Sequence, residues 1–103
     1  MKNEFAYKIF KHENDVILAI SDLSLIGKSF EEGDLCLQVD ENFYHDKECG
    51  RDKAVELIHG ATIINAVGKL IIALMIKENI IDRKNVLTID GVPHAQVVKM
   101  KGE

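Results

Sequence analysis

The sequence predicts a small α+β domain in which strands come first, two helices follow, and further strands close the chain. Apolar and polar residues alternate at a period of two through much of the first third, which is typical of strands with one buried face. Further along, apolar residues take helical spacing, and every residue from Leu70 to Ile76 is apolar. The chain has 103 residues, of which 47% are hydrophobic, so we expect a single domain over 1–103.

The N-terminal part is expected to supply three strands. Alternating apolar residues on both sides of a turn at 12–15 predict an antiparallel β-hairpin over residues 5–20. Residues 22–33 are interpreted as a connection, and renewed alternation over 35–39 predicts the third strand. A small mixed sheet built from these strands would carry the helices on one face.

Two helices are expected in the second half of the chain. The first begins near Asp52, a residue suited to capping, and ends at Gly60. Residues 61–64 are short and β-branched, so a strand and a helical join are both open for them. The second helix is expected over 68–79. Because it is apolar on all sides from Leu70 to Ile76, it is either buried on several sides or covered by a second copy in a homodimer.

The C-terminal elements are expected to be strands that close the sheet. Residues 85–89 predict one strand, and Asp90 and Gly91 predict a turn after it. Residues 91–96 are interpreted as a polar loop, followed by a short edge strand at 97–98.

Composition narrows the class of protein. The formal net charge of −4 opposes a general electrostatic attraction to nucleic acid, although it leaves room for a local basic patch. The start of the chain is polar rather than secretory in character, and the longest apolar run is far shorter than the roughly 20 residues that span a bilayer. We therefore expect a soluble cytoplasmic protein without a membrane partner.

Five short segments occur in an order that points to a known family. They are residues 25–30, 32–33, 42–44, 61–68 and 91–96, the last reading Gly-Val-Pro-His-Ala-Gln. In these segments the chain resembles the archaeal family known as domain of unknown function 424. The resemblance covers nearly the whole chain and implies an archaeal source, a cytoplasmic location and a small stand-alone domain. It implies no activity, because none is established for the family.

His94 is the first candidate for a functional residue. Histidine changes protonation near neutral pH, and Gly91 and Pro93 would fix its direction on a rigid loop that also carries Gln96. Such an imidazole suits a ligand contact or a general acid or base. The alternative is that Pro93 shapes a turn and that His94 bonds to the neighbouring backbone.

The turn before the second helix is the second candidate. If residues 61–64 form a strand, Asn65 and Gly68 belong to a strand-to-helix loop whose N–H groups point outward and bind anions. Lys69 would add a positive charge there. The alternative is a structural turn in which Asn65 caps the helix.

Other patterns predict neither a metal ion nor a cofactor. His45, Cys49 and His59 lie in one stretch, but the close-spaced ligand pair typical of zinc sites is missing. Cys49 has no recognisable base, so no catalytic residue is assigned. Phe43 and Tyr44 could stack on a nucleobase, but a pair of this kind is more often part of the core.

Two classes of function follow from these residues. The first is a binding module for RNA or a ribonucleoprotein that uses Lys28, Lys69, His94 and Gln96. The alternative is a small-ligand-binding or enzymatic domain with His94 in its site. A deep pocket lined by His94, Asn65 and a cation would favour the alternative, whereas a flat basic surface carrying these residues would favour the binding module.

Overall fold

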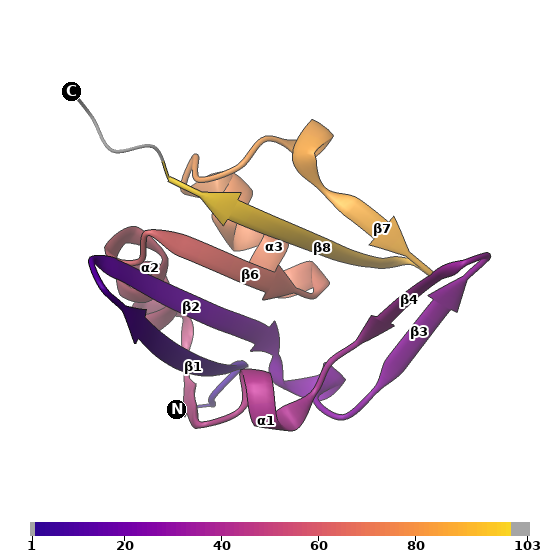
Figure 1. Ribbon diagram of the computed structural model, residues 1–103, viewed down its shortest axis with the longest axis horizontal. Helices are drawn as coiled ribbons and strands as arrows, with labels where there is room; N and C mark the ends of the chain where they lie inside the picture. The colour runs from indigo at the N-terminus through magenta and orange to yellow at the C-terminus, as the bar shows by residue number, and fades with distance from the viewer. Residues whose placement is uncertain (1, 100–103) are drawn as a thin grey trace.

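A computed structural model describes residues 2–99, whose strands form two sheets with helices packed beside them (Figure 1). The larger sheet contains β1 (Phe5–His12), β2 (Asp15–Asp22), β5 (Lys47–Cys49), β6 (Ile63–Val67), β7 (Leu87–Ile89) and β8 (Val92–Val98). The smaller sheet is the hairpin of β3 (Ser29–Glu32) and β4 (Leu35–Gln38). The helices are α1 (Glu41–Tyr44), α2 (Arg51–Gly60) and α3 (Lys69–Lys77), with 3-10 turns η1 (Leu23–Leu25) and η2 (Arg83–Asn85).

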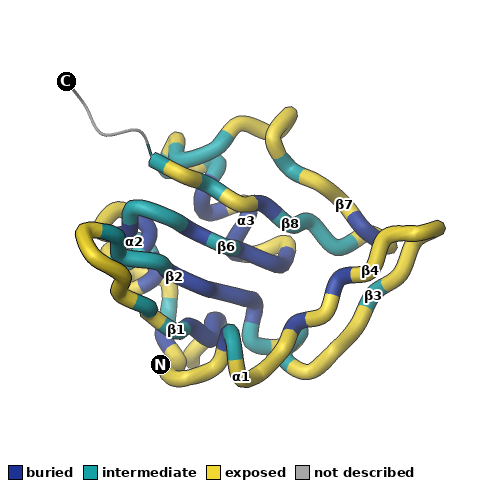
Figure 2. Tube along the Cα trace, viewed as in Figure 1, coloured by how far each residue is buried: buried dark blue, intermediate teal, exposed yellow. Residues whose placement is uncertain are grey.

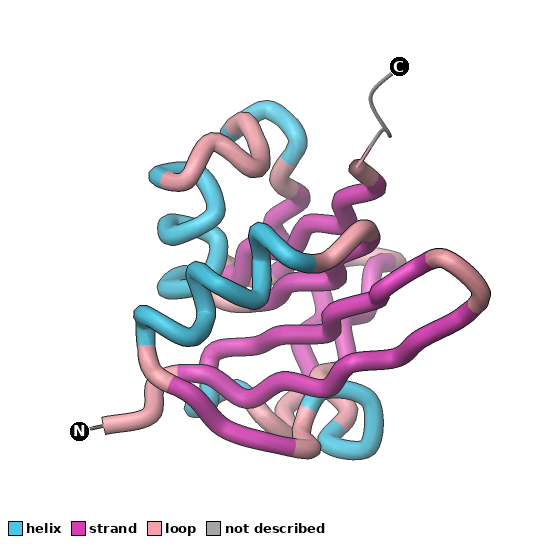
Figure 3. The backbone as a smooth tube through the Cα atoms, turned by 90° about the vertical axis from the view of Figure 1, so that its left-hand side faces the viewer, coloured by secondary structure: helices cyan, strands magenta, loops and turns pink. Residues whose placement is uncertain are grey.

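The strand order of the larger sheet is β5-β1-β2-β6-β8-β7. The pairing of β2 with β6 is parallel, and the other four pairings are antiparallel, so the sheet is mixed. Helices α2 and α3 cover one face, as Figure 3 shows, while the β3–β4 hairpin and α1 pack against part of the other. The predicted α+β class, with two helices on a mixed sheet, is confirmed.

Several predicted elements differ in position from the observed ones. The third predicted strand is β4, but it pairs with β3 in the separate sheet. Strand β3 lies in the segment interpreted as a connection, because only Phe30 of its four residues is even partly buried and no alternation marks it. Strand β5 has the same character, with Cys49 as its one buried residue. Residues 63 and 64 begin strand β6, which settles the choice between strand and helix there.

The segment interpreted as a loop at 91–96 is almost entirely strand β8. The turn before it is only two residues long, and both Asp90 and Gly91 have positive φ angles, of 51° and 78°. Pro93 is accommodated because it lies where β6 has already ended. Its carbonyl accepts a hydrogen bond from Gly68 N–H at 2.9 Å, and its missing N–H removes no rung between β6 and β8.

The core of the protein lies on both faces of the larger sheet, and Figure 2 shows that strands β2 and β6 contain buried stretches. On the helix-covered face, Phe5, Leu18 and Ile64 pack against Ile58 of α2 and Met75 of α3. The apolar character of α3 is largely explained by this packing. Four of its apolar residues are buried within the chain, namely Ile71, Ile72, Leu74 and Met75. Leu70, 48% exposed, and Ala73 are the apolar side chains that α3 leaves exposed.

A buried carboxylate joins the end of β2 to the start of α3. Asp22 is 5% exposed, and its two carboxylate oxygens accept hydrogen bonds from the backbone N–H groups of Leu70 and Ile71, each at 2.9 Å. The residue at the capping position itself, Gly68, has no side chain to offer and a φ angle of 123°. A Cβ atom on Gly68 would lie 2.2 Å from the Cγ atom of Asp22. Glycine at position 68 is therefore needed for both the backbone angle and the space that Asp22 occupies.

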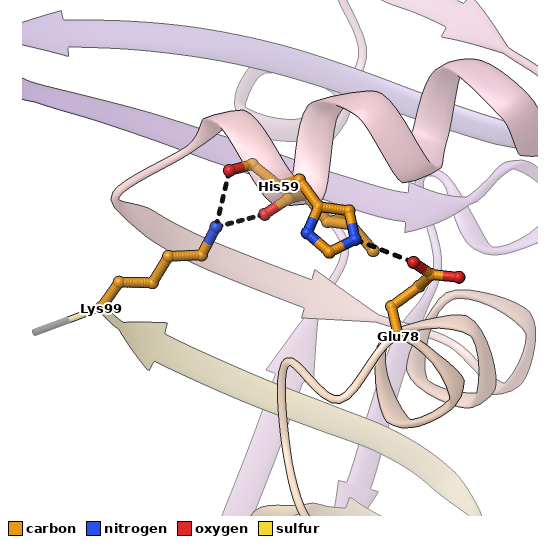
Figure 4. Close-up of polar contacts among 4 residues, drawn as sticks. His59, Glu78 and Lys99 are labelled. Carbon is orange, nitrogen blue, oxygen red and sulfur yellow. Dashed lines mark hydrogen bonds and ion pairs between the residues drawn. The ribbon is translucent and has the colours of Figure 1, made fainter.

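A second set of polar contacts closes the end of α2 (Figure 4). The ammonium group of Lys99 donates to the carbonyl oxygens of Ile58 and His59, at 2.5 and 3.1 Å, where the helix leaves carbonyl groups unpaired. His59 Nε2 lies 2.8 Å from Glu78 Oε1 at the end of α3. The Lys99 contacts link the residue after β8 to the end of α2. The His59–Glu78 contact links the end of α2 to the end of α3.

Within residues 2–99, the helices are too short and insufficiently apolar for any of them to cross a bilayer.

Replacing Gly68 by alanine should destabilise the fold strongly. The new Cβ atom would meet the Asp22 carboxylate, and alanine is strained at this φ angle. We expect thermal or urea unfolding to show a loss of about 2–4 kcal/mol. Gly60→Ala is the matched control, since nothing lies within 4 Å of its added Cβ. A Gly68→Ala protein as stable as Gly60→Ala would contradict the packing described here.

The contribution of Asp22 to stability should increase as the pH falls. Burial, the largest influence, raises the pKa of Asp22 above its ordinary value of 3.8, against the opposing effect of the two N–H groups. A group whose pKa is raised on folding stabilises the protein fully below its unfolded pKa, and this is lost as pH rises through the folded pKa. The difference in unfolding free energy between wild type and Asp22→Asn should therefore shift in favour of wild type toward acid. A shift in the opposite direction would show that the N–H groups outweigh burial.

Candidate functional site

Three of the predicted binding residues come together on one face of the larger sheet. Asn65 of β6 and Gln96 of β8 are directly paired across the two strands, and His94 lies two residues from Gln96 on the same side. These side chains point away from α2 and α3, because the intervening residues Ala66 and Ala95 pack in the core beneath the helices. The strand register thus gathers Asn65, His94 and Gln96 on the face opposite the helices.

An apolar row lies beside these polar side chains. The registers of β1, β2, β6 and β8 align Phe10, Ile17, Ile63 and Val98 across four neighbouring strands. Phe10, Ile17 and Ile63 are partly exposed, and Val98 is 62% exposed. Figure 2 shows this part of the sheet in the colours of partly and fully exposed residues. We call this surface the open face, made up of Phe10, Ile17, Ile63, Asn65, His94, Gln96 and Val98.

Aromatic residues border the open face at β1. The ring of Phe10 stacks on Phe43 of α1, with centroids 5.3 Å apart and planes at 25°. Lys8 Nζ lies 5.1 Å from the centroid of the Phe10 ring and donates a hydrogen bond to the carbonyl oxygen of Asn42. Tyr44 is buried, and burial raises the pKa of its hydroxyl to about 12. Phe10 is thus the aromatic side chain within the open face itself, held by Phe43 and adjoined by a cation.

His94 occupies a strand rather than the loop that the sequence suggested. It lies in β8 between Val67 of β6 and Leu87 of β7 and is half-buried. Burial lowers the pKa of its imidazole below 6.5, so the ring is neutral at pH 7. A neutral imidazole offers one donor and one acceptor. It therefore suits hydrogen bonding to a ligand at neutral pH.

The helix start predicted to bind an anion holds a carboxylate of the protein instead. Asp22 accepts the N–H groups of Leu70 and Ile71, which are the donors an outside anion would use. Asn65 lies within β6 rather than in a loop, and Lys69 is exposed on the first turn of α3. Asn65 therefore belongs with His94 and Gln96 on the sheet, and the N–H groups at the helix start are already bonded to Asp22.

The remaining predicted residues lie at the margins. Lys28 precedes the β3–β4 hairpin and borders a cleft of about 220 Å³ with Asp40 and Asn42. Gly91 forms the turn between β7 and β8, and Pro93 faces Thr88 of β7. Gln96 borders a cleft of about 470 Å³, whereas His94 and Asn65 border neither this cleft nor four other well-formed clefts on the described surface.

The histidines and cysteines considered as metal ligands lie apart. His45 pairs with Glu48 at 2.9 Å, and His59 pairs with Glu78, as Figure 4 shows. Cys49 is a buried free thiol, and burial raises the pKa of this thiol, which disfavours the reactive thiolate. Across residues 2–99, no group of three or more His, Cys, Asp or Glu side chains is placed to hold a metal ion.

Two residues of this region, Phe10 and Asp22, were not predicted from the sequence. Phe10 could have been found, because it shares the period-two spacing of Lys8 on the face opposite Phe5 and Tyr7. Asp22 carries no local signal, because its hydrogen-bond partners lie 48 and 49 positions further along the chain.

A homodimer through the helix from Leu70 to Ile76 stays a prediction. The exposed part of that helix is narrow, as described above. Light scattering after size-exclusion chromatography would settle it, and a mass near 11.6 kDa would show a monomer.

Comparison with known proteins places the chain in a family. The sequence profile of DUF424, described as "Protein of unknown function", matches residues 10–100. The fold is similar to the crystal structure of an uncharacterized conserved protein from Methanopyrus kandleri, with a TM-score of 0.77 and 22% sequence identity over 96% of each chain. No curated protein matched the sequence. Since the profile covers most of the chain, this protein belongs to the DUF424 family, as its short segments had indicated.

Proposed function

We propose that this protein is a binding module that takes single-stranded RNA on the open face of its larger sheet. The main support for this proposal is the arrangement of aromatic and polar side chains on that face. Phe10 on β1 offers a ring for stacking, while Asn65 on β6 and both His94 and Gln96 on the neighbouring strand β8 offer hydrogen-bond donors and acceptors. Splayed single-stranded bases are recognised by this combination of stacking and hydrogen bonds to their edges.

The charges near the open face are more favourable for an anionic ligand than the net charge of the whole protein. The rows that contain Phe10 and Asn65 include Lys8 and no carboxylate. With a net charge of −4, the rest of the molecule repels a polyanion, so few phosphates would be neutralised. Affinity would then come mainly from base contacts, and it should depend only weakly on salt.

The geometry gives less support to an enzyme or a small-ligand site. His94 borders none of the five clefts, and its two neighbours across the sheet are Val67 and Leu87. A small molecule is normally held in a concave pocket that buries most of its surface. The open face suits an extended ligand better.

Removing the stacking ring should weaken RNA binding. Phe10→Leu keeps an apolar side chain but loses the ring, so affinity for a fluorescent single-stranded RNA of mixed sequence should fall about tenfold. Asn65→Ala with Gln96→Ala should cause a similar loss. The exposed residues Leu70 and Gln38 lie elsewhere, so Leu70→Ala and Gln38→Ala should bind as wild type. Fluorescence anisotropy measures all four. Absence of saturable binding, or equal loss in the controls, would overturn the proposal.

The pH dependence should identify His94 as part of the interface. Since burial lowers the pKa of His94 from its ordinary value of 6.5, the imidazole is largely uncharged from ~pH 8 to ~pH 7. Below that range the imidazole gains a proton and attracts phosphate, so affinity should increase toward acid in wild type. His94→Gln should lose this increase while keeping its affinity at neutral pH within about twofold. An identical acid response in both proteins would exclude His94 from the interface.

A further inference from the structure

The edge of the larger sheet at β1 is only half covered. Strand β5 pairs with Phe5, Ala6 and Tyr7 of β1. Asp46, the residue before β5, donates its N–H to the Tyr7 carbonyl, and the pairing along this edge ends there. The second half of β1, from Lys8 to His12, has β2 on one side and no strand of the described chain on the other. Figure 3 shows the β1–β2 hairpin extending beyond β5.

The register identifies the backbone groups that this edge leaves open. The hairpin turn has two residues, so His12 and Asp15 form a hydrogen-bonded pair, and every second residue of β1 bonds to β2. The alternate residues face outward, as Tyr7 does when its carbonyl accepts from Asp46 N–H at 3.0 Å. By the same alternation, Ile9 and Lys11 direct both their N–H and C=O groups away from the sheet.

Side chains around this edge form two adjoining clefts. The first, of about 450 Å³, is lined by Tyr7, Ile9, Lys11, Asp46 and Lys47. The second, of about 250 Å³, lies between β1, β2 and α2 and is mainly apolar, with Val16, Leu18 and Leu57 in its walls. Ile9 borders both clefts and is 40% exposed. The open backbone and an apolar side pocket thus lie next to each other.

We propose that this edge binds an extended polypeptide segment, which adds to β1 as an antiparallel strand in line with β5. Open N–H and C=O groups at a spacing of two residues are complementary to another backbone in the β conformation. The residue opposite Ile9 would point toward α2, so its side chain would enter the apolar cleft. The residue opposite Lys11 would lie near Lys11 and Lys47. The preferred segment therefore reads acidic, any residue, apolar, from its N-terminus.

Charge supports an acidic residue at the first of these positions. Neither Lys11 nor Lys47 forms an ion pair with another residue in the described part of the chain. The cleft they border also contains Asp46, which leaves one net positive charge. This surface is separate from the open face, because Ile9 and Lys11 point to the helix-covered side whereas Phe10 points to the other.

A synthetic peptide tests the backbone part of the proposal. The probe is acetyl-Thr-Glu-Thr-Ile-Thr-Thr-amide, titrated into the full chain and followed by NMR at each backbone amide. Shifts should be confined to residues near Ile9, Lys11, Lys47 and Leu57. Methylating the isoleucine nitrogen of the probe should weaken binding at least about tenfold, because that N–H meets β1. Methylating the central threonine nitrogen, which points away, should change affinity less than about twofold.

A charge exchange tests the side-chain part. Lys11→Glu should lower the affinity for the glutamate probe about tenfold. The same variant should bind a probe with lysine in place of glutamate about as tightly as the wild type binds the glutamate probe. Lys77→Glu on α3 is the matched control and should leave both affinities unchanged. No binding, equal effects of the two methyl groups, or shifts located elsewhere would overturn the proposed edge site.

Discussion

The hydrogen bonds between the Asp22 carboxylate and the first turn of α3 hold together two parts of the chain that are far apart in sequence. Asp22 ends β2, and α3 begins after β6, which lies parallel to β2. A carboxylate at a helix start is favoured by the helix dipole and by the unpaired N–H groups there. This contact and the glycine that makes room for it set the position of α3 on one face of the sheet. The opposite face is then left to the small hairpin, α1 and whatever binds beside them.

That arrangement leaves two surfaces with different chemistry. On the open face, amide, imidazole and aromatic side chains lie between the β3–β4 hairpin and the end of β8, on strands whose positions are fixed by the core. At the β1 edge, the available groups are backbone N–H and C=O beside an apolar cleft. The first suits a ligand with flat rings and hydrogen-bonding edges, and the second suits another strand. The two surfaces point to opposite sides of β1, so a ligand on one need not displace a ligand on the other.

The sequence was most informative where a segment is long and has one buried face. The β1–β2 hairpin and helices α2 and α3 were predicted within a few residues, because their apolar spacing directly reflects their contact with the core. It failed for β3 and β5, whose short strands bury one residue or less and are held by pairing with neighbours. A proline and a histidine in β8 suggested a loop, because sequence does not reveal that Pro93 lies beyond the end of β6.

The candidate site was predictable in its residues but not in its arrangement. Asn65, His94 and Gln96 were selected for their chemistry, and their meeting on one face depends on a register between β6 and β8 that no local pattern defines. The anion site expected at Gly68 is taken by Asp22, because the carboxylate arrives from a strand more than 40 positions earlier. Long-range pairing thus decided which of the candidate residues belong together.

Residue-resolved NMR of the protein titrated with single-stranded RNA would locate the ligand without altering any side chain. If RNA binds the open face, the amide signals of Phe10, Ile63, Asn65, His94 and Gln96 should shift together, and those of α2 and α3 should remain in place. Shifts centred on α3, or spread evenly over exposed lysines, would contradict the proposal.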